Sequence, residues 1–183
     1  MIWKAIMSIA AMLLILASSV EITFPPKPVL LYNPSESAPV GWYRLRPNDA
    51  LKNDVMVAAY APETARRLAH ERDYLPYDYP LIKTVWAMPG AYICIQNMRV
   101  RVPNRPDIYQ LAQDGLGRDM PSLSGCFTLR HGEYFLISKD VQAGFDSRYF
   151  GPVSKEKILG RVQYLGNGTN GAVLKRAEKE EVN

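Results

Sequence analysis

Alternation of hydrophobic and polar side chains predicts that most of the chain beyond residue 40 forms β-strands. In residues 98–102, Met98, Val100 and Val102 alternate with Arg99 and Arg101, and this period of two is typical of a half-buried strand with its arginines in water. Strand-like segments of the same kind cover residues 41–45, 55–60, 83–86, 91–96 and 158–165. The pattern therefore predicts a domain built mainly of strands.

Two features interrupt or join these strands. Pro62 precedes residues 64–72, which are rich in good helix formers, and proline suits the first turn of a helix; Pro76 ends the segment. Residues 127–130 and 133–138 flank the pair His131-Gly132, which predicts a hairpin closed by that turn. The predicted fold class is thus mainly β (α+β), with one short helix inserted.

The N-terminal segment is apolar. Lys4 is followed by residues 5–20, sixteen positions without a charge, which as a helix would span ~24 Å against the ~30 Å of a bilayer core. A signal peptide, a short membrane anchor and a buried core helix are all compatible with it, although the terminal position disfavours the core helix. Lys4 favours an N-terminus inside the cell and export of the remainder.

These features divide the chain into three regions. We expect a signal peptide or anchor at residues 1–24, a folded domain at 25–175 and a polar tail at 176–183. Residues 25–39 are rich in proline and predict an extended spacer that brings Ser37 to the domain surface.

Composition narrows the classes of function. The net charge is +4 and the lysines and arginines are scattered, so we expect no nucleic-acid partner. His70 and His131 are distant from each other and only two cysteines accompany them, so we expect no metal site and no cofactor. In an exported domain Cys94 and Cys126 would form a disulfide, and two unpaired core thiols are the alternative.

Lys83 is an unusual residue for its position. It lies in the apolar segment 79–86, and on a strand both the face it shares with Leu81 and Val85 and the opposite face are largely apolar. A free lysine has a pKa of about 10.4, and burial lowers that pKa toward the range of a general base. The alternative is a lysine at a strand edge whose ammonium group reaches water.

The segment around Ser37 supplies a candidate nucleophile. Ser37 lies between Pro34 and Pro39, in a rigid, non-helical segment in which its N–H and the hydroxyl of Ser35 could face a developing oxyanion. Two solvated serines in a capped loop are the alternative. Farther along, Asp146 and Arg148 are two positions apart on an expected strand, hence on one face, where an acid–arginine pair could brace the strand of Lys83.

Together these segments resemble the signal peptidase I superfamily of serine–lysine proteases, and more narrowly its TraF type, the conjugative-transfer peptidases that mature pilin subunits. The resemblance runs from about Tyr32 to Gly160. It is carried by four motifs: Asn33-Pro34-Ser35-Glu36-Ser37-Ala38-Pro39-Val40-Gly41, Lys83 with Met88-Pro89-Gly90, Gly125-Cys126, and Phe145-Asp146-Ser147-Arg148-Tyr149-Phe150-Gly151-Pro152.

This resemblance implies roles for the residues above. Ser37 would be the nucleophile and Lys83 the general base, Ser35 and the Ser37 N–H would bind the oxyanion, and Asp146 and Arg148 would support the site. It also implies a monomeric, signal-peptidase-like β-barrel or sheet domain without a cofactor, at the periplasmic face of the bacterial cytoplasmic membrane. Its partner there would be a pilin precursor, released as a linear chain or closed head to tail.

Two other functions fit the same motifs. A general signal peptidase for many exported precursors is disfavoured by the compact chain, and a non-catalytic assembly factor of a secretion channel is disfavoured by the presence of both Ser37 and Lys83. One position departs from the family. Signal peptidases often place a lysine-orienting serine two residues before the aspartate, where this chain has Gly144, so Thr84, Ser147 or a water would have to replace it.

Overall fold

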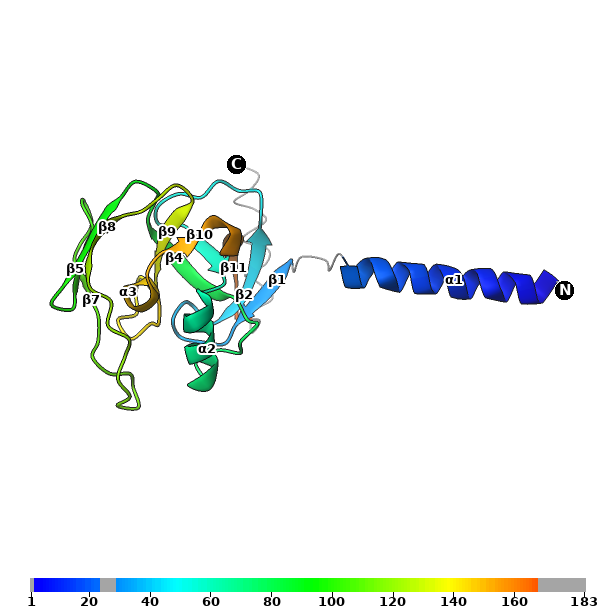
Figure 1. The fold of residues 1–183 in the computed structure, drawn as a ribbon, viewed down its shortest axis with the longest axis horizontal. Coiled ribbons are helices and arrows are strands. Elements are labelled where there is room, and N and C mark those ends of the chain that lie inside the picture. The colour runs from blue at the N-terminus through cyan, green and yellow to red at the C-terminus, as the bar shows by residue number, and fades with distance from the viewer. Residues whose placement is uncertain (1, 24–28, 168–183) are drawn as a thin grey trace.

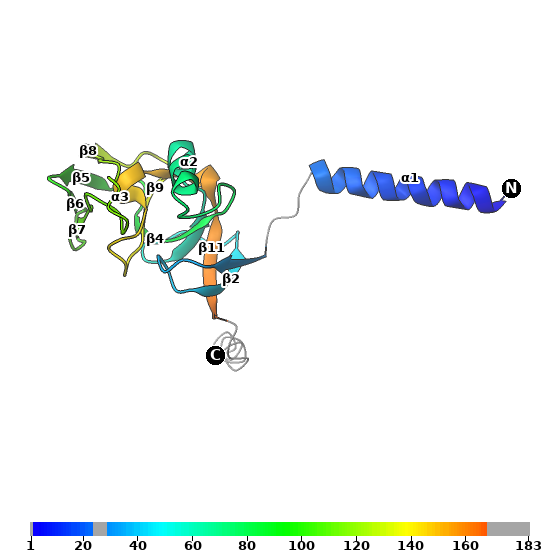
Figure 2. The ribbon, with the colours of Figure 1, turned by 90° about the horizontal axis from the view of Figure 1, so that it is seen from below.

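A computed structural model describes residues 2–23 and 29–167 of the chain (Figure 1). The first element is the helix α1, Ile2–Thr23, which stands apart from the β-rich body in both views (Figures 1 and 2). Across the two described ranges, no helix combines the length and the apolar character that crossing a bilayer requires. The expected tail, 176–183, and the last residues of the expected domain, 168–175, lie outside the described residues.

A seven-stranded antiparallel sheet forms the larger part of the body and confirms the mainly β class. Along the sheet its strands are β1 (Leu30–Asn33), β2 (Gly41–Arg46), β11 (Ile158–Gly166), β3 (Met56–Ala59), β4 (Leu81–Ala87), β9 (Glu133–Ile137) and β10 (Val153–Ser154). The last strand along the chain, β11, lies between β2 and β3. It therefore joins the β1–β2 hairpin to the part of the sheet that contains β4.

A second sheet is smaller and has four strands. Its order is β7 (Ile108–Tyr109), β6 (Arg99–Arg101), β5 (Tyr92–Gln96) and β8 (Gly125–Thr128). Val100 is buried between exposed Arg99 and Arg101, as the alternation predicts, but Met98 is 41% exposed. Met98 has a φ of 63° and belongs to the turn between β5 and β6, so the predicted alternation begins one residue too early.

The main core lies where the two sheets face each other. Its buried side chains come from β4 and β9 of the large sheet, from β5 and β6 of the small sheet, and from the segments beside them: Trp86, Ala87, Ile93, Ile95, Val100, Val102, Leu129, Phe135 and Ile137. The disulfide Cys94–Cys126 joins β5 to β8 at directly paired positions.

The predicted hairpin around His131-Gly132 is wrong. The chain does turn there, with Gly132 at a φ of 79°, but β8 pairs with β5 of the small sheet and β9 pairs with β4 and β10 of the large one. The turn carries the chain from one sheet to the other. Each strand thereby gains a partner and a buried face in a different sheet, which a local turn signal does not reveal.

Short helices complete the fold. α2, Glu63–Glu71, follows Pro62 as predicted and buries Ala65 and Ala69 against Phe145 and Tyr149. A 3-10 turn, η1, covers Lys155–Lys157.

The expected strand at Asp146 and Arg148 is also wrong, because these residues begin α3, Ser147–Phe150. Asp146 caps that helix by accepting a hydrogen bond from the N–H of Arg148, a local bond that competes with strand pairing.

Candidate active site

Asn33 shapes the loop that contains Ser37. The loop joins β1 to β2, and the Asn33 side-chain amide donates to three of its carbonyl oxygens, those of Ser35 (2.7 Å), Ala38 (2.9 Å) and Pro39 (3.2 Å). The hydroxyl of Tyr43 donates to the same Pro39 carbonyl at 2.6 Å. Asn33 is only 4% exposed, so these bonds form away from water and hold the loop in one shape.

Lys83 reaches this loop from β4. Its Nζ lies 2.8 Å from Ser37 Oγ, although the two residues are 46 positions apart in the chain. The lysine is 3% exposed, and its neighbours along β4 from Ile82 to Ala87 are buried as well. Of the two alternatives that the sequence leaves open, the structure shows the lysine inside the fold and not at a water-exposed edge.

The surroundings of Lys83 change its protonation. Burial lowers its pKa from the ordinary 10.5 to about 8, the Asp146 carboxylate acts against that change, and Arg148 adds to it. A neutral fraction is therefore present near pH 7, and a neutral amine can accept the proton of a serine hydroxyl.

Ser35 is the second hydroxyl at the site. Its Oγ donates to Asn33 Oδ1 at 3.0 Å and lies 3.0 Å from Ser37 Oγ. The two serines and the lysine, singled out from the sequence as a possible set, are thus brought together by the β1–β2 hairpin and β4.

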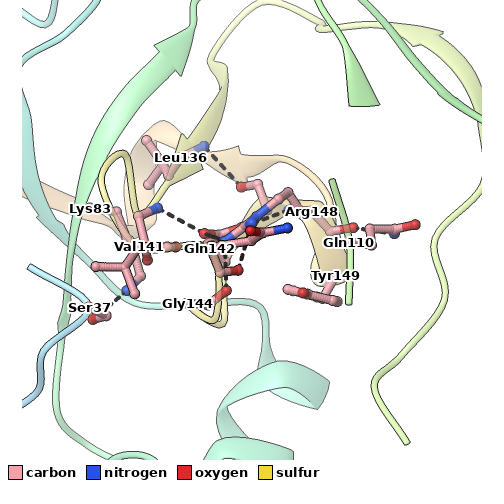
Figure 3. A network of polar contacts seen from close by, with 12 residues as sticks. Ser37, Lys83, Gln110, Leu136, Val141, Gln142, Gly144, Arg148 and Tyr149 are labelled. Atoms are coloured by element: carbon pink, nitrogen blue, oxygen red, sulfur yellow. Dashed lines mark hydrogen bonds and ion pairs between the residues drawn. The ribbon is translucent and has the colours of Figure 1, made fainter. Parts of the chain in front are cut away.

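Asp146 and Arg148 form a buried ion pair whose charges act on Lys83. Figure 3 shows Arg148 in its network of polar contacts, in the same view as Ser37 and Lys83. Asp146 is completely buried and Arg148 is 3% exposed, and two of the guanidinium nitrogens each bond one carboxylate oxygen at 2.8 Å. The guanidinium also donates to the carbonyl oxygens of Tyr109, Val141, Gln142 and Gly144.

This pair fixes the loop that follows β9. Asp146 Oδ2 accepts the N–H of Ser138 at 2.8 Å, and Ser147 Oγ accepts the N–H of Leu136 at 3.0 Å. These two bonds hold β9 and the residue after it, and β9 pairs with β4, the strand that carries Lys83. The hydrogen bonds that Asp146 and Arg148 make in the described part of the chain go to groups other than Lys83, so their support of the lysine is indirect.

Two cavities meet at the serine and lysine. One, of about 320 Å³, has apolar walls that include Ala38, Met56, Ile82 and Ile137, with Lys139 and Asp140 at its border. The other, of about 300 Å³, is lined mostly by side chains from or near α2 and α3, among them Ala69, Tyr74, Leu81, Met120 and Phe145. Glu36, Ser37, Lys83 and Val141 belong to both.

The other predicted residues lie elsewhere. Cys94 and Cys126 form the disulfide of the small sheet and line neither cavity. Within residues 2–23 and 29–167 no three metal-ligating side chains gather. Sequence reasoning quoted Asn33 only as part of a motif and did not single out Ser138, and nothing in the local pattern signals either side chain's position.

The chain matches the family model described as signal peptidase, peptidase S26, over residues 2–165. It is 32% identical over 137 residues to the plasmid transfer protein TraF of Escherichia coli, covering 69% of this chain and 77% of that protein. It is 30% identical over 141 residues to a probable conjugal transfer protein TraF of Sinorhizobium fredii, covering 72% and 73%. A crystal structure of a signal peptidase I from Enterococcus faecalis aligns with a TM-score of 0.38 at 15% identity, over 63% of this chain and 98% of that one.

Proposed function

The chain belongs to the S26 family of signal peptidases, with TraF proteins of conjugal transfer among its relatives, and we propose that it is a serine endopeptidase that matures a pilin precursor. The observation that carries this proposal is the 2.8 Å contact between Ser37 Oγ and the buried Lys83 Nζ. Ser37 is the nucleophile and Lys83 the general base, and no cofactor takes part.

The proposed reaction proceeds through an acyl-enzyme. Neutral Lys83 takes the hydroxyl proton as Ser37 Oγ attacks the carbonyl carbon of the scissile bond. The Ser35 hydroxyl and the Ser37 N–H stabilise the oxyanion. The Lys83 ammonium then gives its proton to the leaving amine, and an ester to Ser37 remains. Water, activated by the same lysine, releases a linear product, whereas the amino group of the same substrate chain would close a ring.

The two cavities support an extended peptide as substrate. A peptide that crosses from one to the other passes Ser37, because both cavities include it. Their walls are largely apolar, which suits the small or apolar side chains around a cleavage site and leaves specificity to shape. We propose that the substrate is held at the periplasmic face of the cytoplasmic membrane, with the N-terminal segment of this chain as signal peptide or anchor.

Mass spectrometry tests the proposal directly. The full chain is expressed with a candidate pilin from the same conjugation system, beside Ser37→Ala and Lys83→Ala, with exposed Ser124→Ala and Lys155→Ala as matched controls. We expect processing by the wild type and both controls and none by the two site variants. Processing that survives either site variant would refute the Ser37–Lys83 mechanism. A product lighter by one water than the trimmed linear chain identifies ring closure.

The same assay separates the other two functions. A general signal peptidase would also cleave unrelated exported precursors supplied in place of the pilin. A non-catalytic assembly factor would leave every precursor intact while pilus assembly still required the protein. Of these two alternatives, only the general signal peptidase would use the acyl-enzyme reaction of Ser37 and Lys83 described above.

A further inference from the structure

Gly144 is a glycine because of the space around it and not because of its backbone. A Cβ added there would lie 2.1 Å from Ser138 Oγ and 2.4 Å from Ser138 Cβ. Its φ is outside the left-handed region that favours glycine, so the backbone at this position would accept any L-residue without strain. The side chain of Ser138 therefore occupies the place that a side chain at residue 144 would fill.

Ser138 follows directly on β9, the strand that pairs with the strand of Lys83. In the pairing of β4 with β9, Thr84 faces Ile137 and Val85 faces Leu136. β9 ends at Ile137, and this antiparallel register continued by one residue would set Ser138 opposite Lys83. Directly opposed residues project their side chains from the same face. Gly144 borders the second cavity together with Ser37 and Lys83, and Figure 3 shows it on the same side of Arg148 as those two residues.

The hydroxyl of Ser138 is uncommitted. Ser138 is 4% exposed, and its Oγ bonds to no other group in the described part of the chain. A buried hydroxyl without a partner is costly, so such a group usually has a reason to be retained.

The other hydroxyls considered for this role are less suitable. Ser147 Oγ already accepts the N–H of Leu136. Thr84 is adjacent to Lys83 on β4, and neighbouring side chains on a strand point to opposite faces. Ser138 is thus the free hydroxyl that shares a face with the lysine.

We propose that Ser138 positions Lys83 by accepting a hydrogen bond from Nζ, which leaves the nitrogen lone pair directed at Ser37. In this proposal the hydroxyl, which has no partner in the structure, turns toward the amine by rotation about the Ser138 Cα–Cβ bond, while the N–H of Ser138 stays bonded to Asp146. The Ser138 side chain fills the space beside Gly144, and its hydroxyl would there orient the lysine in place of a side chain at residue 144. The inference rests on the Ser37–Lys83 mechanism proposed above.

Kinetics of Ser138→Ala form the first test. We expect kcat for pilin processing to fall about ten- to a hundredfold with little change in KM, the size expected when a hydrogen bond to a charged group is lost. The acidic limb of the pH–kcat profile should move to lower pH, because removing an acceptor of the ammonium lowers the pKa of Lys83. A variant that merely loosens the site admits water, and the limb then moves to higher pH, which would overturn the proposal.

A second readout needs no peptidase activity. Trace acetylation of the full chain with limiting acetic anhydride, followed by mass spectrometry of the peptide containing Lys83, gives the pH at which this lysine loses its proton, with exposed Lys155 as internal standard. We expect a midpoint about 8 in the wild type and a lower one in Ser138→Ala. Ser124→Ala, which removes an exposed serine hydroxyl, is the control and should leave the midpoint unchanged.

Exchange of the two positions tests the replacement itself. Gly144→Ser alone should fold poorly, because its Cβ collides with Ser138. Ser138→Gly combined with Gly144→Ser removes the collision. The kcat of this double variant should be at least tenfold higher than that of Ser138→Ala. Wild-type kcat and an unchanged acetylation midpoint in Ser138→Ala would overturn the inference. An acetylation shift as expected in a chain that cleaves no pilin would instead refute the proposed function and leave the positioning role intact.

Discussion

Lys83→Met should make the protein more stable at neutral pH while it removes the proposed general base. Lowering the lysine pKa from 10.5 to about 8 corresponds to about 3 kcal/mol of destabilisation of the ammonium, at ~1.4 kcal/mol for each pH unit. Methionine has a similar length and no charge, so it escapes this cost in a buried position. It also loses the hydrogen bond to Ser37, worth about 1 kcal/mol. We expect a net gain of about 2 kcal/mol at pH 7.

The gain should depend on pH with a defined sign. The folded pKa of Lys83 is lower than the unfolded one, so between pH 8 and 10.5 the unfolded chain binds the extra proton and the stability of the wild type rises with pH. Below pH 8 the full cost of the buried ammonium is present. The advantage of Lys83→Met is thus largest below pH 8 and disappears as the pH approaches 10.5.

Urea unfolding of both proteins at several pH values between 6.5 and 10.5 measures this difference, since ionisations shared by the two proteins cancel. Exposed Lys155→Met is the control and should show neither gain nor pH dependence. Lower stability of Lys83→Met at pH 7, or a difference that stays constant up to pH 10.5, would refute a lysine held with a depressed pKa. Neither result depends on knowing the substrate.

Two further predictions concern the supports of the site, and a third concerns the disulfide of the small sheet. Arg148→Met leaves the Asp146 carboxylate buried without its cation and should lower the free energy of unfolding by about 3–5 kcal/mol in urea titrations; a loss below 1 kcal/mol would contradict the buried pair. Asn33→Ala should lower stability by about 1–3 kcal/mol and slow pilin processing more than tenfold, because three loop carbonyls lose one shared donor; an unchanged rate would contradict its role. The oxidised protein should show no free thiols when denatured without reductant, and replacing both Cys94 and Cys126 by serine should cost about 3–4 kcal/mol for a loop of 32 residues; two free thiols would refute the bond.

Local signals predicted the elements of the fold better than their partners. The alternation in residues 99–102 and the proline before α2 act over a few positions, and the structure follows both. Pairing of β8 and β9 depends on which sheet offers each strand a buried face, and that is decided by residues far away in the chain. The strand predicted at Asp146 is wrong for a different reason. Aspartate favours the cap of a helix, and Asp146 caps α3.

The site shows the same division. The apolar faces of its strand made a buried Lys83 one of two hypotheses, beside a lysine that reaches water, and the structure shows the buried one. The contact to Ser37 followed from the resemblance and not from any local pattern, since the two lie 46 residues apart. Ser138 was not found because its importance depends on a register across β4 and β9 and on the space beside Gly144.

The place of β11 in the sheet determines when the site can exist. The hairpin that carries Ser37 and the strand that carries Lys83 are both synthesised early, yet β11 is the strand that hydrogen-bonds to β2 on one side and to β3 on the other. A nascent chain without residues 158–166 lacks the strand that joins the β1–β2 hairpin to β3 and β4. The loop that carries Ser37 and the strand that carries Lys83 are therefore joined through the sheet only after residues 158–166 have been synthesised.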